Sequence, residues 1–209
     1  MSTEPSRRAR QAALTRREIL LAARALFAQQ GYAGTSMAQI AERAEVSVQT
    51  LYDSVGSKSA IVRALNDLID EEGEVARLAA RIPDAEAAVD LIAIPVDISR
   101  NINERCMDII TAVFGAAAVE PEMQAVRDES RRRHREGVGR VTQRLAALGA
   151  LRPGLAVEEA ADTIAALTDP DVVRTFVLAY GWSWQDWHAR TLDAITRLVL
   201  APPPPRRRS

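Results

Sequence analysis

The chain has few cysteines and histidines, and it has no long apolar run. Its 209 residues include a single cysteine, Cys106, so no disulfide can form within the chain. The two histidines, His134 and His188, lie far apart and lack the spacing of metal ligands. No apolar run approaches the roughly 20 residues that span a bilayer, and the Arg-rich start precedes a helix too amphipathic for a signal peptide. We therefore expect a cytoplasmic protein without a metal, a cofactor or a membrane partner.

The sequence also lacks the motifs of the common enzyme classes. It contains no Gly-rich phosphate loop, no nucleophile elbow and no histidine beside a candidate nucleophile. Aromatic residues make up only 4% of the chain, but hydrophobic residues make up 47%, which is sufficient for a sizeable core. We therefore expect a folded protein that is not an enzyme.

Lysine is nearly absent, and the charges are unevenly distributed. Lys58 is the only lysine; all other cations are arginine. The formal net charge is −1, but residues 1–64 hold nine cations and five anions, whereas residues 65–209 hold eighteen cations and twenty-three anions. The first segment is thus net basic and the second net acidic. A basic segment is what binding to DNA requires, because neutralised phosphates release their counterions.

Apolar residues recur at helical spacing along the chain, and no segment shows the alternation of a strand. Prolines and glycines separate the periodic stretches. Thr15 and Glu18 have the spacing of a capping box, so we expect the first helix to start there and to end at Gly31. These patterns predict an all-α fold.

Residues 35–58 have the pattern of two short capped helices joined by a tight turn. Ser36 and Gln39 form a second capping box, and Ser47 is placed to cap the following helix. This spacing is typical of a helix-turn-helix. With the other apolar positions turned inward, the exposed face of the second helix consists of Val48, Gln49, Thr50 and Asp53. Tyr52 flanks this face. A short helix with such a face suits the major groove of DNA.

The positions that carry a family signature are dispersed over the N-terminal third of the chain. They are Ile19-Leu20-Leu21-Ala22-Ala23-Arg24-Ala25-Leu26-Phe27, Gly31-Tyr32, Thr35-Ser36, Ile40-Ala41, Val46-Ser47, Thr50-Leu51-Tyr52 and Lys58. Together they resemble the N-terminal signature of the TetR family of transcription regulators. Glu45 departs from the pattern, because the family often has Gly there, and a left-handed non-glycine residue costs about 1 kcal/mol. Ser54-Val55 also depart, standing where a His-Phe pair is common.

The resemblance implies a DNA-binding domain followed by a second helical domain. We expect four segments: a disordered basic arm (1–14), a three-helix helix-turn-helix DNA-binding domain (15–60), a helical ligand-binding and dimerisation domain (61–200) and a disordered tail (201–209). The Arg-rich segment that starts at Arg7 either reaches a minor groove or stays solvated.

The candidate DNA-binding residues fall into two groups. Gln49 and Thr50 are predicted to contact base edges, because Gln pairs bidentately with adenine and Thr meets a thymine methyl; Val48 shares their exposed face. Five residues are assigned by position to phosphates, through helix N-termini, hydroxyls and charge: Thr35, Ser36, Ser47, Tyr52 and Lys58.

One recognition helix contacts too few base pairs to select a site in a genome, which predicts a twofold homodimer. Its two recognition helices would enter successive major grooves about 34 Å apart on a near-palindromic operator. In proteins similar to this one the last long helices form a four-helix interface, which would involve residues 157–167 and 183–200 here.

The resemblance also implies a pocket for a small-molecule effector in the C-terminal domain. Occupation of that pocket would favour a spacing of the recognition helices that does not bind DNA. We expect four residues near it: Cys106, Ile110, Phe114 and Trp182.

Three functional classes follow from these observations. The first is a ligand-responsive transcriptional repressor; the second is a ligand-independent DNA-binding or architectural regulator; the third is an enzyme on an all-α scaffold. The helix-turn-helix pattern and the missing enzyme motifs favour the first two classes over the third.

Overall fold

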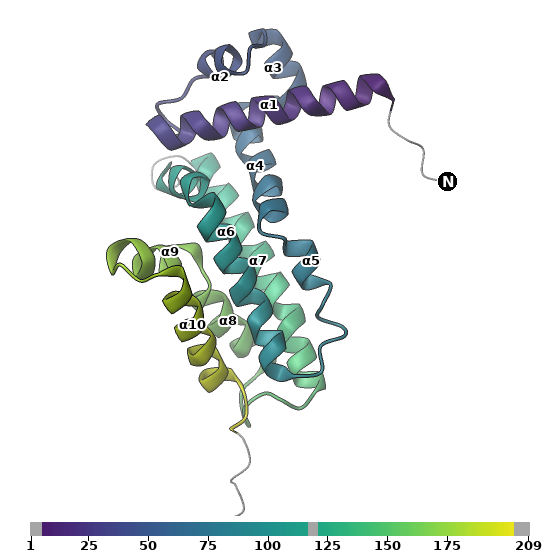
Figure 1. Ribbon diagram of the computed structural model, residues 1–209, viewed down its shortest axis with the longest axis vertical. Coiled ribbons are helices and arrows are strands. Elements are labelled where there is room, and N and C mark those ends of the chain that lie inside the picture. The colour runs from purple at the N-terminus through teal and green to yellow at the C-terminus, as the bar shows by residue number, and fades with distance from the viewer. Residues whose placement is uncertain (1–5, 117–120, 203–209) are drawn as a thin grey trace, which may run out of the picture. The chain divides into compact units, whose positions relative to one another are not determined.

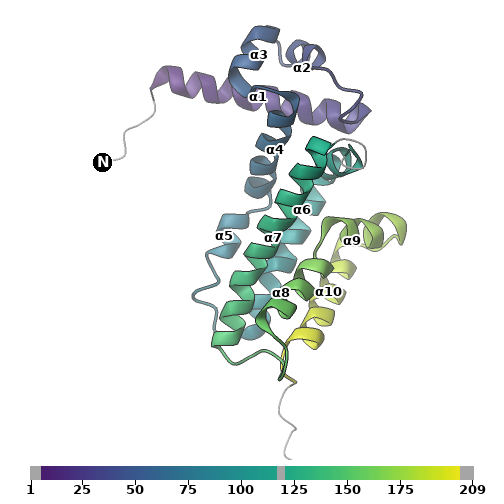
Figure 2. The same ribbon diagram turned by 180° about the vertical axis from the view of Figure 1, so that it is seen from behind.

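The structure is a computed structural model that describes residues 6–116 and 121–202, and the side chains of all of these except residues 112–116. The described residues form helices and no strand, apart from one isolated bridge between Leu151 and Leu200 (Figures 1 and 2). The predicted all-α class is therefore confirmed. None of the helices in the described part of the chain has the length and apolar character needed to cross a membrane.

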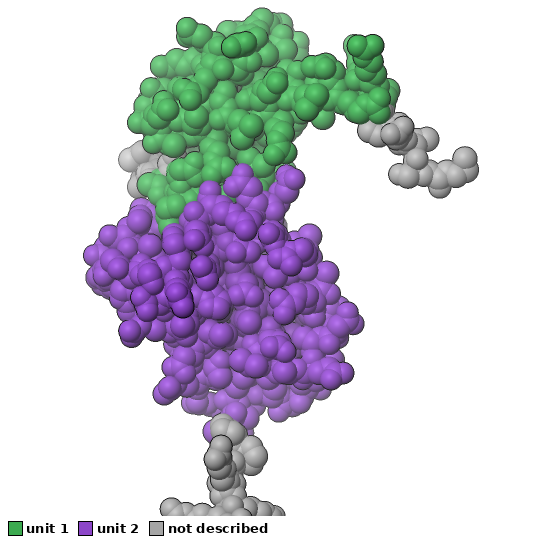
Figure 3. Space-filling model, in the orientation of Figure 1, with its two compact units in different colours: residues 1–69, 106–129 green, residues 70–105, 130–209 purple. Residues whose placement is uncertain are grey.

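The chain divides into two compact units, coloured separately in Figure 3. The first contains residues 1–69 and 106–129, and the second contains residues 70–105 and 130–209. Two long helices, α6 (Ala88–Ala116) and α7 (Pro121–Ala147), contribute residues to both units. Within α6 the backbone leaves helical geometry at Cys106, with φ −125° and ψ 17°. The interruption coincides with the point at which the chain passes from the second unit to the first.

The first unit is built on α1 (Arg7–Gln30), against which α2 (Met37–Arg43) and α3 (Val48–Val55) pack; α4 (Lys58–Glu72) follows them (Figure 1). Its core consists of apolar side chains from all four helices, each at most 1% exposed: Ile19, Phe27, Ile40, Leu51, Ile61 and Leu65. The guanidinium of Arg24 on α1 forms a bidentate ion pair with Asp108, at 2.8 and 2.9 Å. The N-terminal helices thus share one apolar core.

Helix α1 begins earlier than the sequence predicts. It starts at Arg7, where the Ser6 hydroxyl accepts a hydrogen bond from the backbone of Ala9, rather than at the expected Thr15 cap. Residues 7–14 are therefore helical, although we expected them in a disordered arm. Ser6 is as good a cap as Thr15, and the Arg and Ala residues that follow it are strong helix formers. The remainder of the predicted arm, residues 1–5, lies outside the described residues.

The second unit packs its helices around a separate core. Besides its parts of α6 and α7 it contains α5 (Val75–Ala79), α8 (Val157–Leu167), α9 (Pro170–Arg174), a π-helical turn η1 (Thr175–Ala179) and α10 (Trp184–Val199). Helices α8 and α10 pack against each other. The core is a single cluster of buried side chains that includes Leu91, Ile92, Val141, Leu145, Ile164, Trp187 and Ile195. Asp169 caps the start of α9, and Ser183 caps the start of α10.

Candidate nucleic-acid interface

Helices α2 and α3 have the caps that the sequence predicts. At the start of α2, Ser36 Oγ accepts from the Gln39 backbone at 3.2 Å, and Gln39 Oε1 accepts from the Ser36 backbone at 2.8 Å. At the start of α3, Ser47 Oγ accepts from the Thr50 backbone at 3.0 Å. Each cap satisfies amides that the first turn of a helix leaves without partners. Both helix starts are consequently fixed by residues next to them in the sequence.

The turn between the two helices depends on a left-handed residue. Glu45 has φ 55°, and only one other described non-glycine residue, Glu74, has a positive φ. The backbone of Val46 then donates to the Ala41 carbonyl at 3.0 Å and closes the turn. Glu45, which stands where the TetR family often has glycine, therefore adopts the left-handed backbone that favours glycine.

The exposed face of α3 collects most of the predicted DNA-binding residues. Leu51 and Val55 point into the core, at 0% and 7% exposure, so the other residues of α3 face outward or lie at the edge. Val48 is 44% exposed and Tyr52 49% exposed, and Ser47, Gln49 and Thr50 are also exposed. Such an exposed face on a capped eight-residue helix fits the width of the major groove.

Gln49 and Asp53 form a hydrogen bond on this face, one turn apart. The Gln49 Nε2 group donates to Asp53 Oδ1 at 2.8 Å. Asp53 is the only charged residue of α3, and among the described residues no Lys or Arg pairs with it. The i,i+4 spacing that allows this contact is visible in the sequence, but Asp53 was not among the predicted contact residues.

Thr35 and Lys58 lie together, in contacts within the unit. Thr35 is 2% exposed, and its hydroxyl donates to the Gly31 carbonyl at 2.8 Å. Lys58 Nζ donates to the carbonyls of Tyr32 and Thr35 at 2.8 and 2.9 Å, and lies 4.0 Å from the centre of the Tyr32 ring. The Thr35 side chain is thus turned away from solvent. Two of the three N–H groups of the Lys58 ammonium are engaged, which leaves one for another acceptor.

The predicted ligand-binding residues do not come together within either unit. Cys106 and Ile110 are buried in the first unit, at 0% and 3% exposure. Trp182 belongs to the second unit, where its ring lies 4.5 Å from the Phe176 ring and 5.0 Å from the Arg190 guanidinium. The side chain of Phe114 lies outside the described part of the structure.

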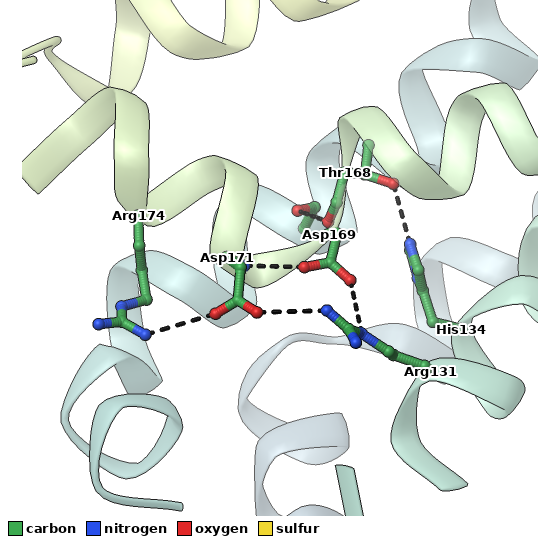
Figure 4. Close-up of polar contacts among 7 residues, drawn as sticks. Arg131, His134, Thr168, Asp169, Asp171 and Arg174 are labelled. Carbon is green, nitrogen blue, oxygen red and sulfur yellow. Dashed lines mark hydrogen bonds and ion pairs between the residues drawn. The ribbon is translucent and has the colours of Figure 1, made fainter. Parts of the chain in front are cut away.

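A buried polar cluster in the second unit was missed by the sequence patterns (Figure 4). His134 Nε2 lies 2.9 Å from the Thr168 hydroxyl, which itself donates to the Ile164 carbonyl. Ser99 Oγ donates to the Thr168 carbonyl at 2.8 Å. Burial lowers the pKa of His134, although nearby Asp169 and a backbone hydrogen bond with Ala165 oppose that shift. The cluster joins α6, α7 and the end of α8 through neutral hydrogen bonds.

Ion pairs lie next to this cluster. Arg131 donates to Asp169 at 3.0 Å and to Asp171 at 3.2 Å (Figure 4). The Arg131 guanidinium therefore links α7 to the start of α9. Within the described residues, no three His, Cys, Asp or Glu side chains gather in a way that would hold a metal ion.

Comparisons with known proteins find one family model and several solved structures of similar fold. Residues 19–65 match the model of the bacterial regulatory proteins, tetR family. The structure is similar to NalD, the secondary repressor of the MexAB-OprM multidrug efflux pump in Pseudomonas aeruginosa, with a TM-score of 0.74 and 19% identity, over 91% of this chain and 98% of NalD.

Two further neighbours were solved with small molecules bound. SmeT, in complex with triclosan, has a TM-score of 0.72 and 21% identity over 90% of this chain and 92% of SmeT. FadR from Bacillus subtilis, in complex with stearoyl-CoA, has a TM-score of 0.72 and 17% identity over 87% of this chain and 98% of FadR. A search of curated proteins finds no match.

Proposed function

We propose that this chain, whose residues 19–65 match the model of the bacterial regulatory proteins, tetR family, is a repressor that binds a palindromic operator as a homodimer and is released by a small molecule. The observation that carries the proposal is the exposed face of α3, whose two inward residues fix the helix in the core while its polar residues stay in solvent. The net basic charge of residues 1–64 supports the same partner, because DNA binding is driven largely by phosphate contacts.

The proposed contacts follow the geometry of α3. Gln49 and Thr50 read base edges, and Val48 offers an apolar contact to a thymine methyl. Ser36 and Ser47, at the starts of α2 and α3, approach phosphates together with Tyr52 and Lys58. Thr35 takes a supporting part instead: its carbonyl holds the Lys58 ammonium, while its own hydroxyl is used within the unit.

The homodimer would place two recognition helices on one operator. In our proposal α8 and α10 of each protomer form the interface, because they are the last long helices and pack against each other. Two copies of α3 then contact half-sites one helical turn apart, about 34 Å. The dimer would also have a second state, in which the spacing of its two recognition helices does not fit the operator. An effector that binds this second state more tightly would shift the population toward it and so release the operator.

Selection of bound DNA from a random pool tests the proposal. We expect the full chain to recover a near-palindromic sequence whose half-site centres lie about 10 base pairs apart or a multiple of that spacing. Affinity for this sequence should fall steeply with salt, because several phosphates are neutralised. Failure of the chain to bind any duplex at low salt would contradict the proposal.

Small molecules then distinguish a ligand-responsive regulator from a ligand-independent one. Triclosan and a long-chain acyl-CoA are the probes, since similar folds bind them. A ligand-responsive chain releases the selected duplex when a bound probe reaches saturation. Binding of a probe without any change in operator affinity would contradict release by that probe, because a ligand shifts only an equilibrium whose two states it binds differently.

A further inference from the structure

We propose that Asp53 determines the base specificity of α3 by orienting the side-chain amide of Gln49. The inference rests on the proposed function, since it concerns which base the helix reads. Its starting point is the 2.8 Å hydrogen bond from Gln49 Nε2 to Asp53 Oδ1 on the exposed face. Neither side chain has a role in the core, because both are exposed.

The orientation of the Gln49 amide follows from the chemistry of its partner. A carboxylate only accepts hydrogen bonds, so the NH₂ group of Gln49, and not its carbonyl oxygen, must face Asp53. One N–H is then used within the helix. The groups that remain for a partner are the second N–H and the carbonyl oxygen Oε1, one donor beside one acceptor.

This donor and this acceptor are complementary to the major-groove edge of adenine but not to that of guanine. In the major groove adenine presents the N7 acceptor beside the N6 donor, which pair with an amide N–H and an amide oxygen. Guanine presents two acceptors, N7 and O6, and one of them would face Gln49 Oε1. Turning the amide over to bind guanine would bring Oε1 against the Asp53 carboxylate, where two acceptors repel.

The surroundings of Asp53 strengthen this discrimination on DNA. It is the only charged residue of α3, and in the described structure it has no cation that neutralises it. Water weakens its hydrogen bond with Gln49 in the free protein. When DNA excludes water from this face, a carboxylate without a hydrogen-bond donor costs free energy. Losing the hydrogen bond from the Gln49 N–H therefore costs more on DNA than in the free protein. Asp53 is thus a positioning residue that acts through Gln49.

The test compares base preference at one position of the selected operator. That position is the one at which Gln49→Ala relaxes the preference. There we expect the unmodified chain to favour adenine over guanine by about tenfold. Asp53→Asn should reduce the ratio to about threefold or less, because an Asn side chain offers both a donor and an acceptor and so lets the Gln49 amide turn over.

Glu42→Gln is the matched control, because it removes one negative charge from an exposed position on α2 without touching Gln49. It should raise affinity for all duplexes as Asp53→Asn does, yet keep the tenfold ratio. In the Gln49→Ala background, Asp53→Asn should leave the ratio unchanged. Thermal melting checks that every variant folds.

The possible failures separate the inference from the proposed function. An unmodified chain that binds no duplex overturns both. A chain that selects an operator but prefers guanine at the Gln49 position overturns only the inference. The same holds if Asp53→Asn and Glu42→Gln keep equal adenine-to-guanine ratios, because Asp53 would then act on DNA by charge alone.

Discussion

Glu45 shows how a single backbone angle affects the helix-turn-helix. Its φ of 55° lies in the left-handed region, where a side chain crowds the following carbonyl. The turn needs this conformation, because the next amide, from Val46, bonds to the Ala41 carbonyl. A non-glycine residue in this position costs about 1 kcal/mol of folding free energy.

Replacement of this residue by glycine should stabilise the protein. For Glu45→Gly we expect a gain of up to about 1 kcal/mol, reduced by the greater freedom of glycine in the unfolded chain. The corresponding rise in Tm is about 2–4 °C for each kcal/mol in a chain of this size. Glu42→Gly, the same replacement inside α2, should instead lower stability by about 1 kcal/mol. Loss of stability in both variants would show that the turn is unstrained.

Lys58 combines a structural contact with a proposed phosphate contact. The variant Lys58→Gln separates these two roles, and Gln49→Ala serves as its comparison. Lys58→Gln keeps N–H donors for the Tyr32 and Thr35 carbonyls but removes the charge. We expect it to weaken binding to all duplexes about equally and to reduce the slope of log K against log salt by about 0.9. Gln49→Ala should instead change base preference and leave the slope unchanged. An unaltered slope in Lys58→Gln would assign Lys58 to the fold alone.

At the scale of elements, α7 and α8 meet at a histidine that burial keeps neutral. The Thr168 hydroxyl donates to Ile164, so it can only accept from His134, and Nε2 must carry the proton. Burial lowers the pKa of His134 from its ordinary 6.5, with Asp169 and the Ala165 backbone opposing. On α7 and α9 the charged neighbours Arg131 and Asp171 are already paired. Protonation of His134 therefore opposes folding.

The sign of the resulting pH dependence follows from this shift. The unfolded chain binds a proton near pH 6.5 while the folded chain does not, so stability is complete above pH 6.5 and declines as the pH falls toward the folded pKa. The decline is at most about 1.4 kcal/mol per pH unit. Urea unfolding between pH 7.5 and 5.5 should show it, and His134→Gln, which keeps a donor for Thr168, should reduce it. Equal slopes in the two proteins would contradict the assignment.

The elements differ in how far the sequence predicts them. The starts of α2 and α3 were predicted, because each cap lies within three residues of the amide it satisfies. The start of α1 was predicted too late, because Ser6 and Thr15 are equivalent caps and local patterns cannot choose between them. The cluster of Ser99, His134 and Thr168 could not be predicted, since its members are 34 and 69 residues apart along the chain.

The two parts of the candidate site, the exposed face of α3 and the contacts of Thr35 and Lys58, also differ in how far the sequence predicts them. The exposed face of α3 follows from helical periodicity, and so do Val48, Gln49 and Tyr52 on it. The burial of Thr35 and the carbonyl partners of Lys58 depend on how α1 and α4 pack, which periodicity does not show. Sequence patterns therefore predict which residues of the recognition helix are exposed, but not the packing contacts of Thr35 and Lys58 beside it.

At the scale of the whole molecule, the proposed dimer requires an apolar surface on the second unit. Leu198 of α10 is 49% exposed although it is large and apolar, and Leu178 of η1 and Tyr180, which follows η1, are 60% and 66% exposed. Single exposed apolar residues are ordinary, but here they belong to or adjoin the helices assigned to the interface. An interface between two copies of the chain would bury these exposed side chains.

A charge at Leu198 should therefore separate the protomers. For Leu198→Glu we expect dimer dissociation to become at least tenfold easier in sedimentation experiments, because an interface would bury a carboxylate without a partner. Operator affinity should fall with it, since one recognition helix contacts only a half-site.

Leu148→Glu is the matched control, at a leucine that is 37% exposed and follows α7 rather than lying on α10. It should leave both the dimer and the operator affinity unchanged, because its side chain stays in solvent in either state. Equal loss of dimer in the two variants would indicate a general effect of added charge. A stable dimer in Leu198→Glu would place the interface elsewhere, and a monomeric unmodified chain that still binds the full operator tightly would contradict the dimer itself.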